Sequence, residues 1–263
     1  MALIGRVEST WRYPVKSMAG EELEQAFIGF GGVYGDRFYA FVSPEGPKRF
    51  PFFTAREKER MLRYHPIYRH PERMVQPPNL AEAEAGMTGV TPLYPEREEF
   101  MVDVRTPSGD LFAIDDPLLI TSLCEGVREG RPLKLLCSHR SMTDCRPISL
   151  FSLQTARQLS EEVGMDLDKR RFRANLYLDL FSGAGFEESK FIDKRVRIGA
   201  KAVIAIVSQD SRCKMITLDP ETAAANPEVM RTVARAHGGM AGIYGAVVVE
   251  GIIRPGDDIL LQA

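Results

Sequence analysis

The sequence predicts a β-dominated α+β fold built on barrel-like sheets. Most candidate elements are short apolar or alternating runs bounded by glycine or proline, which is typical of strands. The few helical patterns lie between groups of strands and do not alternate with them one by one. The chain also has no internal repeat, no GxGxxG after a strand and no GxxxxGKS or GxxxxGKT motif. A nucleotide-binding βαβ layout is therefore a poor fit.

The first half of the chain reads as strands joined by turns. Strands are expected at Leu3–Glu8, Leu23–Ile28 and Arg37–Val42, with a glycine-rich turn over residues 29–35 between the last two. Thr54 and Glu57 have the spacing of a capping box and predict a short helix over Ala55–Leu62. The Glu72–Glu98 stretch mixes proline, glycine and acidic residues without periodicity, so we expect a long surface excursion there.

The second half contains three predicted helices and further strands. The helices follow capping residues and are expected after Asp116, from Ser152 to Val163, and after Asn226. Their predicted ends are Gly126 or Gly130, Gly164 and Gly238. Strands are expected at Leu133–Cys137, Arg195–Gly199, Lys201–Val207, Ala246–Glu250 and Asp258–Leu261. Alternation from Phe172 to Leu180 predicts one more strand, with Arg173 and Asn175 on the face opposite the core.

Composition describes an ordinary globular protein and excludes some partners. Of 263 residues, 44% are hydrophobic and 27% charged, and the formal net charge is −2. This balance gives no bulk attraction to nucleic acid or to an anionic membrane, so any bound anion needs a local cluster of basic residues. The longest apolar run is Ala202–Val207, and the N-terminus lacks the features of a signal peptide. We therefore expect a cytoplasmic protein.

The four cysteines point to one reactive position. Their spacing contains no CxxC pair and no zinc-finger or iron–sulfur pattern, so a metal here would use one protein thiolate and a cofactor with its own ligands. Cys213 lies between Arg212 and Lys214, and adjacent cations favour a thiolate that is nucleophilic and binds soft metals. The alternative is that Cys213 is a small buried hydrophobic residue. Cys124 and Cys137 lie in apolar stretches and are expected in the core.

Several basic residues stand beside turns, where they could grip an anion. They are Lys16 with Ser17, Arg37, Arg56 and Arg173 with Asn175. Guanidinium groups and helix N-termini commonly bind phosphate oxygens. Each residue alone could equally be a solvated charge or half of an ion pair.

Seven segments, in order, resemble one family. Residues 211–222 (SRCKMITLDPET) resemble the RCxxTTVDPxTG signature of MOSC domains, which are named after the C-terminal part of molybdenum-cofactor sulfurases. Residues 172–175 resemble the FRPN strand of that family, and residues 242–245 and 251–257 resemble its closing FGxY and GxIxxGD elements. Residues 13–17, 35–37 and 54–56 resemble the β-barrel domain that precedes MOSC in the amidoxime-reducing group. Ala174, Ile216 and Ala223 depart from these patterns, but no charged or thiolate group is lost.

The resemblance implies a fold, a cofactor and a site. An N-terminal β-barrel domain (residues 1–115) would pack with a MOSC β-barrel-like domain (residues 116–263) that carries a few helices. Molybdenum cofactor, Mo-molybdopterin, is implied, and pyridoxal phosphate is not. Cys213 would be the catalytic residue and metal ligand. Cofactor contacts are implied for Lys16, Ser17, Arg37, Arg56, Asp144, Ser152, Arg173, Asn175, Arg212, Thr217 and Asp219. Thr217 and Asp219 would brace the cysteine loop, although Asp219 could equally stabilise a turn.

The function implied by the resemblance is an oxidoreductase that reduces small N-hydroxylated compounds. Electrons would come from a separate flavin, haem or iron–sulfur reductase, because no iron–sulfur pattern follows the MOSC segment. No nucleic acid or membrane partner is expected. Three alternatives stay open: a carrier of molybdenum cofactor, a persulfide sulfur carrier that uses Cys213, and an unrelated β-barrel protein with a structural cysteine.

Overall fold

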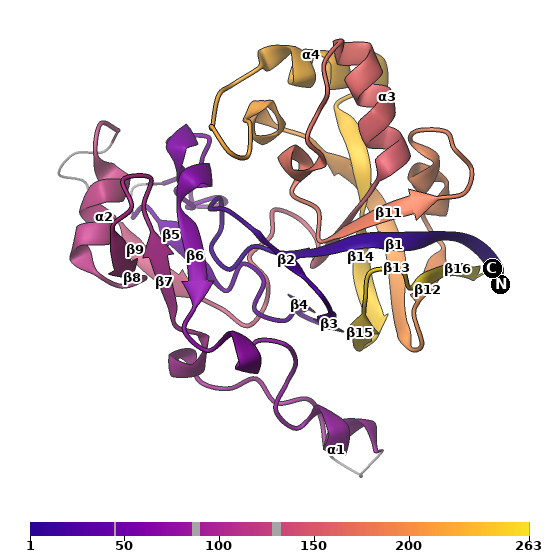
Figure 1. Cartoon of the computed structure of the whole chain (residues 1–263), viewed down its shortest axis with the longest axis horizontal. Coiled ribbons are helices and arrows are strands. Elements are labelled where there is room, and N and C mark those ends of the chain that lie inside the picture. The colour runs from indigo at the N-terminus through magenta and orange to yellow at the C-terminus, as the bar shows by residue number, and fades with distance from the viewer. Residues whose placement is uncertain (45, 86–89, 128–132, 263) are drawn as a thin grey trace.

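Seven strands form a closed barrel, on the right-hand side of the view in Figure 1. The computed structural model describes residues 1–44, 46–85, 90–127 and 133–262 (Figure 1). Around the barrel the order is β11 (Leu176–Leu180), β10 (Ile148–Ser152), β14 (Met240–Val249), β13 (Ala202–Ser211), β12 (Arg195–Ile198), β16 (Asp258–Gln262) and β1 (Ala2–Arg12). Pairing of β11 with β1 closes the circle, and β2 (Glu21–Leu23) extends the sheet beyond β1. The predicted β-dominated α+β fold with barrel-like sheets is confirmed.

Alternating side chains fill the barrel. Val7, Leu178, Val196, Ile204 and Ile259, from five different strands, are at most 2% exposed and belong to one apolar cluster. Burial of such side chains is the main favourable contribution to folding. Most neighbouring strands are antiparallel, while β10 and β11 are parallel and are joined through a helix. The chain ends lie side by side, because Ala2 pairs with Leu261 (Figure 1).

Three smaller sheets pack beside the barrel. They are β15 (Gly251–Ile253) with β3 (Ala26–Gly29) and β4 (Gly32–Val33), β5 (Tyr39–Val42) with β9 (Lys134–Cys137), and β6 (His65–Tyr68) with β7 (Val102–Arg105) and β8 (Leu111–Ala113). Their core is aromatic, and the rings of Phe38 and Phe100 stack with centroids 4.5 Å apart. Strands cross between the two halves, since β1 belongs to the barrel and β15 pairs with β3. The predicted boundary between the two domains, after residue 115, stays a prediction.

The predicted helix caps at Asp116 and Asn226 are confirmed, and Ser152, expected as the first residue of a helix, caps that helix. Asp116, Ser152 and Asn226 each accept a backbone N–H at the start of α2 (Pro117–Cys124), α3 (Leu153–Val163) and α4 (Pro227–His237). Gly164 and Gly238 close α3 and α4 in the left-handed conformation that glycine adopts without a steric penalty. Helix α2 ends at Cys124, just before Gly126, and Gly130 lies outside the described residues. Helices α3 and α4 pack together over one end of the barrel (Figure 1).

The predicted helix over Ala55–Leu62 is wrong. Thr54 Oγ1 accepts the Arg56 N–H, and its carbonyl accepts the N–H groups of Glu57 and Lys58, so it caps a single turn. The chain then enters a short 3₁₀ helix, η1 (Glu59–Arg63). A longer helix does not form because the backbone of Lys58 is extended. The strand expected over Leu23–Ile28 is likewise divided, between β2 and β3.

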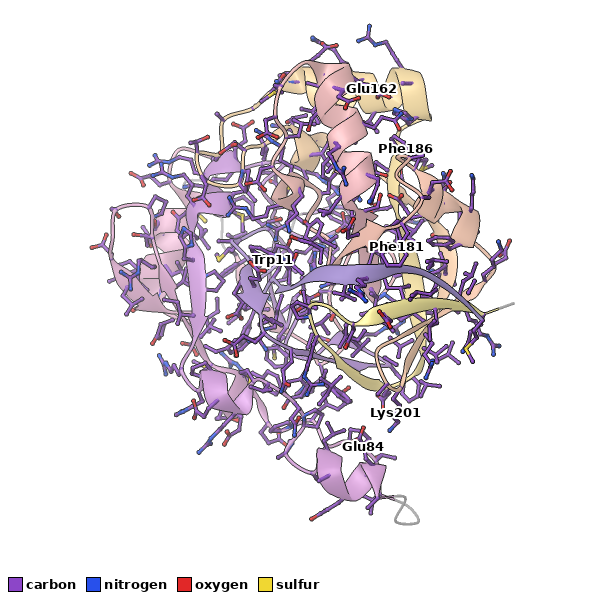
Figure 2. All side chains as sticks on the ribbon, turned by 45° about the vertical axis from the view of Figure 1, so that its right-hand side comes forward. Trp11, Glu84, Glu162, Phe181, Phe186 and Lys201 are labelled. Atoms are coloured by element: carbon purple, nitrogen blue, oxygen red, sulfur yellow. The ribbon has the colours of Figure 1, made fainter. Side chains whose placement is uncertain are left out.

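The stretch between Glu72 and Glu98 forms an arm at one side of the molecule. It holds the end of η2 (Pro71–Arg73), helix α1 (Leu80–Glu84) and the start of η3 (Arg97–Phe100), and residues 86–89 lie outside the described part. Figure 1 shows α1 at the lower edge of the molecule. Lys201, which directly precedes β13, forms an ion pair of 3.1 Å with Glu84, and Figure 2 labels both side chains. The expected surface excursion is thus confirmed where the chain is described.

Among the described helices, none combines the length and the apolar character that would be needed to cross a lipid bilayer.

Candidate functional site

Cys213 opens onto a cleft between the barrel and the smaller sheets. The cleft encloses about 700 Å³ of space, part of it open to solvent. Its basic lining residues are Lys16, Arg37, Arg56, Arg171, Arg173 and Arg212. The remaining lining residues are Ser17, Thr54, Thr143, Asp144, Ser149, Phe172, Asp210, Ser211, Cys213, Met215, Ile216 and Tyr244. Segments far apart in the sequence therefore meet at one cysteine.

The cleft brings together most of the residues that the sequence singled out. Those that line it are Lys16, Ser17, Arg37, Arg56, Asp144, Arg173, Arg212 and Cys213. Four others, Ser152, Asn175, Thr217 and Asp219, do not line it and instead hold neighbouring loops and helices, as described below. A role of any of these residues in binding a cofactor stays a prediction.

Unusual backbone conformations present the basic residues to the cleft. Ser17, Arg37 and Arg173 have φ values of 67°, 42° and 51°, in the left-handed region that most side chains avoid. Such conformations cost of order 1–3 kcal/mol each and persist where surrounding contacts fix them. For Arg37 the fixing contacts are visible: its N–H donates to Tyr13 O and its carbonyl accepts the Met142 N–H. The fold thus carries a local energetic cost at three residues that line the cleft.

Tyr13 lies between two arginines of the cleft. The guanidinium carbons of Arg37 and Arg173 are 4.4 and 4.2 Å from the centroid of its ring, within cation–π range. Arg37 Nη1 donates to both carboxylate oxygens of Asp36, at 2.9 and 2.7 Å, and Nη2 donates to Arg173 O. Burial acts to lower the pKa of Arg37, but Asp36 and Tyr13 outweigh it, and the pKa is raised. Arg37 is therefore a fixed positive charge.

Arg173 is less well satisfied than Arg37. Its Nη2 is buried and has no hydrogen-bond partner. Burial lowers its pKa to about 10, with the nearby charge of Arg37 acting in the same direction and Tyr13 opposing. The group is still charged at neutral pH. A buried, charged donor without a partner is costly, and an anion in the cleft would satisfy it.

A carboxylate links two further cations at the cleft. Asp144 lies 2.5 Å from Lys16 Nζ and 2.6 Å from Arg56 Nη2. Burial works to raise the pKa of Asp144, but Lys16 and Arg56 prevail and hold it below its usual value. Lys16 also donates to Met142 O, and the Phe50 and Phe52 rings flank its ammonium group. Asp144 thus positions both cations instead of leaving them mobile.

Cys213 lies two residues after the end of β13 and directly precedes a 3₁₀ turn, η6 (Lys214–Thr217). It is half-buried and keeps an extended backbone. The neighbouring cations are bound elsewhere: Arg212 pairs with Asp210 at 2.9 Å and donates to two carbonyls, while Lys214 pairs with Glu59 at 2.8 Å. The reason for expecting a thiolate from sequence neighbours is therefore weakened. The other basic residues that share the cleft with the thiol come from distant segments.

Asp210 and Tyr244 are cleft residues that sequence reasoning missed. Asp210 is only 3% exposed, and burial raises its pKa to about 6 against the opposing effects of Arg212 and Tyr244. Burial also raises the pKa of Tyr244, so its hydroxyl stays protonated. One signal was available for Asp210: it stands two residues before Arg212, and alternation along a strand places such residues on the same face.

Asn175 supports the cleft from behind and does not face it. Its Oδ1 accepts from the backbone N–H and hydroxyl of Ser149, and its Nδ2 donates to Trp11 O. The strand expected over Phe172–Leu180 is confirmed from Leu176 onward, but the placement of Arg173 and Asn175 together on its outer face is wrong. Residues Lys169–Phe172 form a 3₁₀ helix, η4, which ends at the left-handed Arg173, and β11 begins only at Leu176.

Ser152, Thr217 and Asp219 have structural partners. Ser152 caps α3, and its hydroxyl donates to the buried carboxylate of Glu188 at 2.8 Å. Thr217 donates to Lys214 O, within the turn that follows Cys213. Asp219 Oδ1 accepts from Thr222, while Oδ2 accepts from Arg171, which lines the cleft. Asp219 therefore both holds a turn and orients a basic residue.

Cys213 does not belong to a larger group of metal-binding side chains among the described residues. In the ranges that the structure describes, His, Cys, Asp and Glu nowhere form a cluster of three or more that could hold a metal. Cys124 is buried as expected, but Cys137 is exposed, so its predicted place in the core is wrong. Its strand β9 pairs with β5 and leaves most of its side chains in solvent.

Comparison with known proteins places these features in a family. Residues 4–108 match the MOSC N-terminal beta barrel domain, and residues 138–260 match the MOSC domain. Molybdenum cofactor sulfurase of Drosophila pseudoobscura pseudoobscura is 30% identical over 125 residues, which are 47% of this chain and 14% of the relative. The corresponding protein of Drosophila ananassae is 34% identical over 97 residues, 36% of this chain and 12% of the relative. The chain thus spans only a small part of these curated relatives.

The solved structures that match this chain are less similar to it in sequence. The YUAD protein from Bacillus subtilis is 12% identical with a TM-score of 0.48, covering 98% of this chain and 96% of that one. YiiM from Geobacillus stearothermophilus is 19% identical with a TM-score of 0.36, covering 45% and 55%. The two domain matches, which together span most of the sequence and meet at the Cys213 cleft, show that this chain belongs to the MOSC family and carries the MOSC N-terminal β-barrel domain.

Proposed function

We propose that this protein is a cytoplasmic oxidoreductase that binds molybdenum cofactor in the Cys213 cleft and reduces small N-hydroxylated compounds. One observation carries the proposal. The unpartnered guanidinium nitrogen of Arg173 is buried at a cleft that also contains Cys213. A free cationic donor and a soft thiol ligand together suit an anionic cofactor that brings a soft metal.

The donor set fits the cofactor. The chain has a formal charge of −2, so the basic wall of Lys16, Arg37, Arg56 and Arg173 is a local feature. Such a wall would hold the phosphate and the polar edge of the pterin, with Ser17 as a further hydrogen-bond donor. Cys213 would supply the thiolate ligand, and the remaining metal ligands would belong to the cofactor, since no cluster of protein ligands occurs among the described residues.

The chain's own residues would orient the substrate and exclude water. When bound, the cofactor would supply a metal that can change oxidation state and pass electrons to the N–O bond. Phe172, Met215 and Ile216 form an apolar part of the cleft wall, which lowers the local dielectric and strengthens the polar contacts. The overall change takes R–NHOH, two electrons and two protons to R–NH2 and water. The electrons would come from a separate flavin, haem or iron–sulfur reductase.

The first test is the molybdenum content of the purified protein. Chains are expressed in a host that makes the cofactor, and metal is measured by elemental mass spectrometry in wild type, Cys213→Ala and Cys137→Ala. Cys137 is a matched control because its thiol is exposed and does not line the cleft. We expect near-equimolar metal in wild type and control and a large loss in Cys213→Ala. Equal metal in both variants would contradict Cys213 as the ligand.

A second candidate function is sulfur transfer through a persulfide on Cys213. It is favoured by the sequence similarity to proteins described as molybdenum cofactor sulfurases. The same preparations separate the two functions. Sulfane sulfur without molybdenum in the wild type supports the sulfur carrier, whereas bound cofactor without turnover of an amidoxime supports a cofactor carrier. Bound cofactor with turnover supports the reductase.

A further inference from the structure

Asp210 differs from the other buried carboxylates near the cleft in how it is satisfied. It lies at the end of β13 with its side chain 4% exposed, and Arg212 Nη2 is 2.9 Å from its Oδ2. That nitrogen makes no aligned hydrogen bond. Asp36, by contrast, accepts two hydrogen bonds from Arg37 and a third from the Tyr13 N–H. The Asp210 carboxylate is therefore buried beside a cation but poorly hydrogen-bonded to it.

Arg212 cannot turn to improve the contact. Its Nε donates to Ala241 O at 2.6 Å and its Nη1 to Phe172 O at 2.9 Å. The Phe151 and Phe172 rings flank its guanidinium carbon at 5.5 and 5.4 Å. With these contacts made, Arg212 has little freedom to reorient, and only Nη2 is left to approach Asp210. Such a carboxyl group gains little from ionisation and can retain its proton.

The surroundings connect Asp210 to the cleft. Both Asp210 and Tyr244, from neighbouring β14, line the same space as Cys213, and a side-chain hydrogen bond joins them. The charged groups that face Asp210 are Arg212 on its own segment, and Arg37 and Asp144 from other walls of the cleft. Arg212, Arg37 and the Tyr244 hydroxyl favour the carboxylate, while burial and Asp144 favour the protonated form and prevail.

We propose that Asp210 is the proton donor of the Cys213 cleft and protonates the oxygen that leaves the substrate nitrogen, an assignment that rests on the proposed reductase function. In R–NHOH the N–O bond breaks as two electrons arrive from the separate reductase. Asp210 gives its proton to the departing hydroxyl group, which leaves as water. A second proton from solvent completes the amine, and Asp210 regains its own proton from solvent. Atoms and charge then balance.

The reaction gives one test of the assignment. We compare cofactor-loaded wild type with Asp210→Asn, Asp210→Glu and the control Asp103→Asn, whose carboxylate pairs with Arg69 and does not line the cleft. The wild-type kcat should fall as pH rises above about 6, because the acid form is lost. Removing a general acid should lower kcat by roughly 10²-fold or more and abolish that pH limb. Glutamate should restore part of the rate, and the control should match wild type.

A second readout needs no cofactor. In the cofactor-free protein, the carboxyl carbon-13 resonance that disappears in Asp210→Asn should titrate near pH 6. The chemical shift of the new carboxyl in Asp210→Glu provides the same reading if Asp210→Asn does not fold. A midpoint below pH 4 would overturn the proposal, because the acid would then be absent at working pH.

The outcomes distinguish a failure of the proposed reductase function from a failure of the Asp210 assignment. Wild type without any turnover of N-hydroxylated compounds contradicts the proposed function, and the assignment of Asp210 falls with it. Wild type with turnover but an unchanged rate and pH profile in Asp210→Asn contradicts the Asp210 assignment alone. Molybdenum content measured on every sample ensures that a lost rate reflects the missing proton and not a missing cofactor.

Discussion

At the scale of single residues, the cleft combines cations that are paired with a carboxylate and one, Arg173, for which the described residues supply no such pair. Arg37 and Lys16 are tied to Asp36 and Asp144, whereas Arg173 Nη2 has no partner. A buried guanidinium nitrogen without a hydrogen-bond partner costs of order 1–3 kcal/mol. The strained backbone of Arg173 adds to that cost. Both features fit a residue whose hydrogen-bond partner is an anionic ligand.

Arg173→Ala should weaken cofactor retention by roughly tenfold or more, since one charge-assisted hydrogen bond contributes about 1.5–3 kcal/mol. Retention is measured by fluorescence of the oxidised pterin released from purified protein. Arg231→Ala, a change on the exposed face of α4, serves as the matched control. Urea unfolding of both variants shows whether the fold is kept. Unchanged pterin content in Arg173→Ala would remove this residue from the binding site.

A site residue could be predicted from the sequence where its role depends on neighbouring residues, and could not where its role depends on distant contacts. Arg37 and Arg173 were found because basic residues beside turns are recognisable locally. Asp210 was not found because its burial and its poor alignment with Arg212 arise only when β13 and β14 close the barrel. The position of Asn175 was predicted wrongly for a related reason. The hydrogen bonds of its side-chain amide, to Ser149 and Trp11, join residues that are far apart in the sequence.

At the scale of elements, the ends of helices were predictable and the start of β11 was not. Caps at Asp116 and Asn226 depend on neighbouring residues only, so pattern and structure agree. The Phe172–Leu180 alternation failed because η4 occupies its first part, and the Arg171 guanidinium holds that turn to Thr217 O and Asp219. Tertiary contacts thus override a local strand pattern.

The start of α3 supplies a prediction at this scale. Ser152 accepts the Thr155 N–H and donates to Glu188, a carboxylate only 1% exposed that also accepts from Thr155 Oγ1. Ser152→Ala should lower the free energy of unfolding by about 1–3 kcal/mol, through the lost cap and the weakened bonding of Glu188. Urea denaturation measures this.

The same variant tests whether Ser152 also binds cofactor. Because its hydroxyl is engaged at the helix start and does not line the cleft, Ser152→Ala should keep wild-type molybdenum content. Ser160→Ala, on the same helix, is a matched serine control that removes one hydroxyl bonded within the segment. Loss of metal in Ser152→Ala without loss of stability would return Ser152 to the cofactor site.

At the scale of the whole molecule, the two family domains are not independent in space. Strand β1, from the start of the chain, fills the gap in the barrel between β11 and β16. Gly5 in β1 approaches β11 so closely that an added Cβ would lie 2.5 Å from Asp179 O, which shows how tightly this strand is packed. In the other direction, β15 pairs with β3. The cleft itself draws residues from both halves.

Interleaved strands predict cooperative behaviour. Residues 116–263 expressed alone would lack β1, so β11 and β16 would become open edges and Val7 would leave the barrel core. Unpaired edges and a missing core strand favour aggregation over folding. We therefore expect the fragment to show no cooperative urea transition by far-UV circular dichroism, whereas the full chain unfolds in a single step. A fragment that unfolds cooperatively on its own would mean that the barrel closes without β1. The MOSC domain would then fold by itself, and the basic cleft residues before residue 116 would belong to a separate domain added to it.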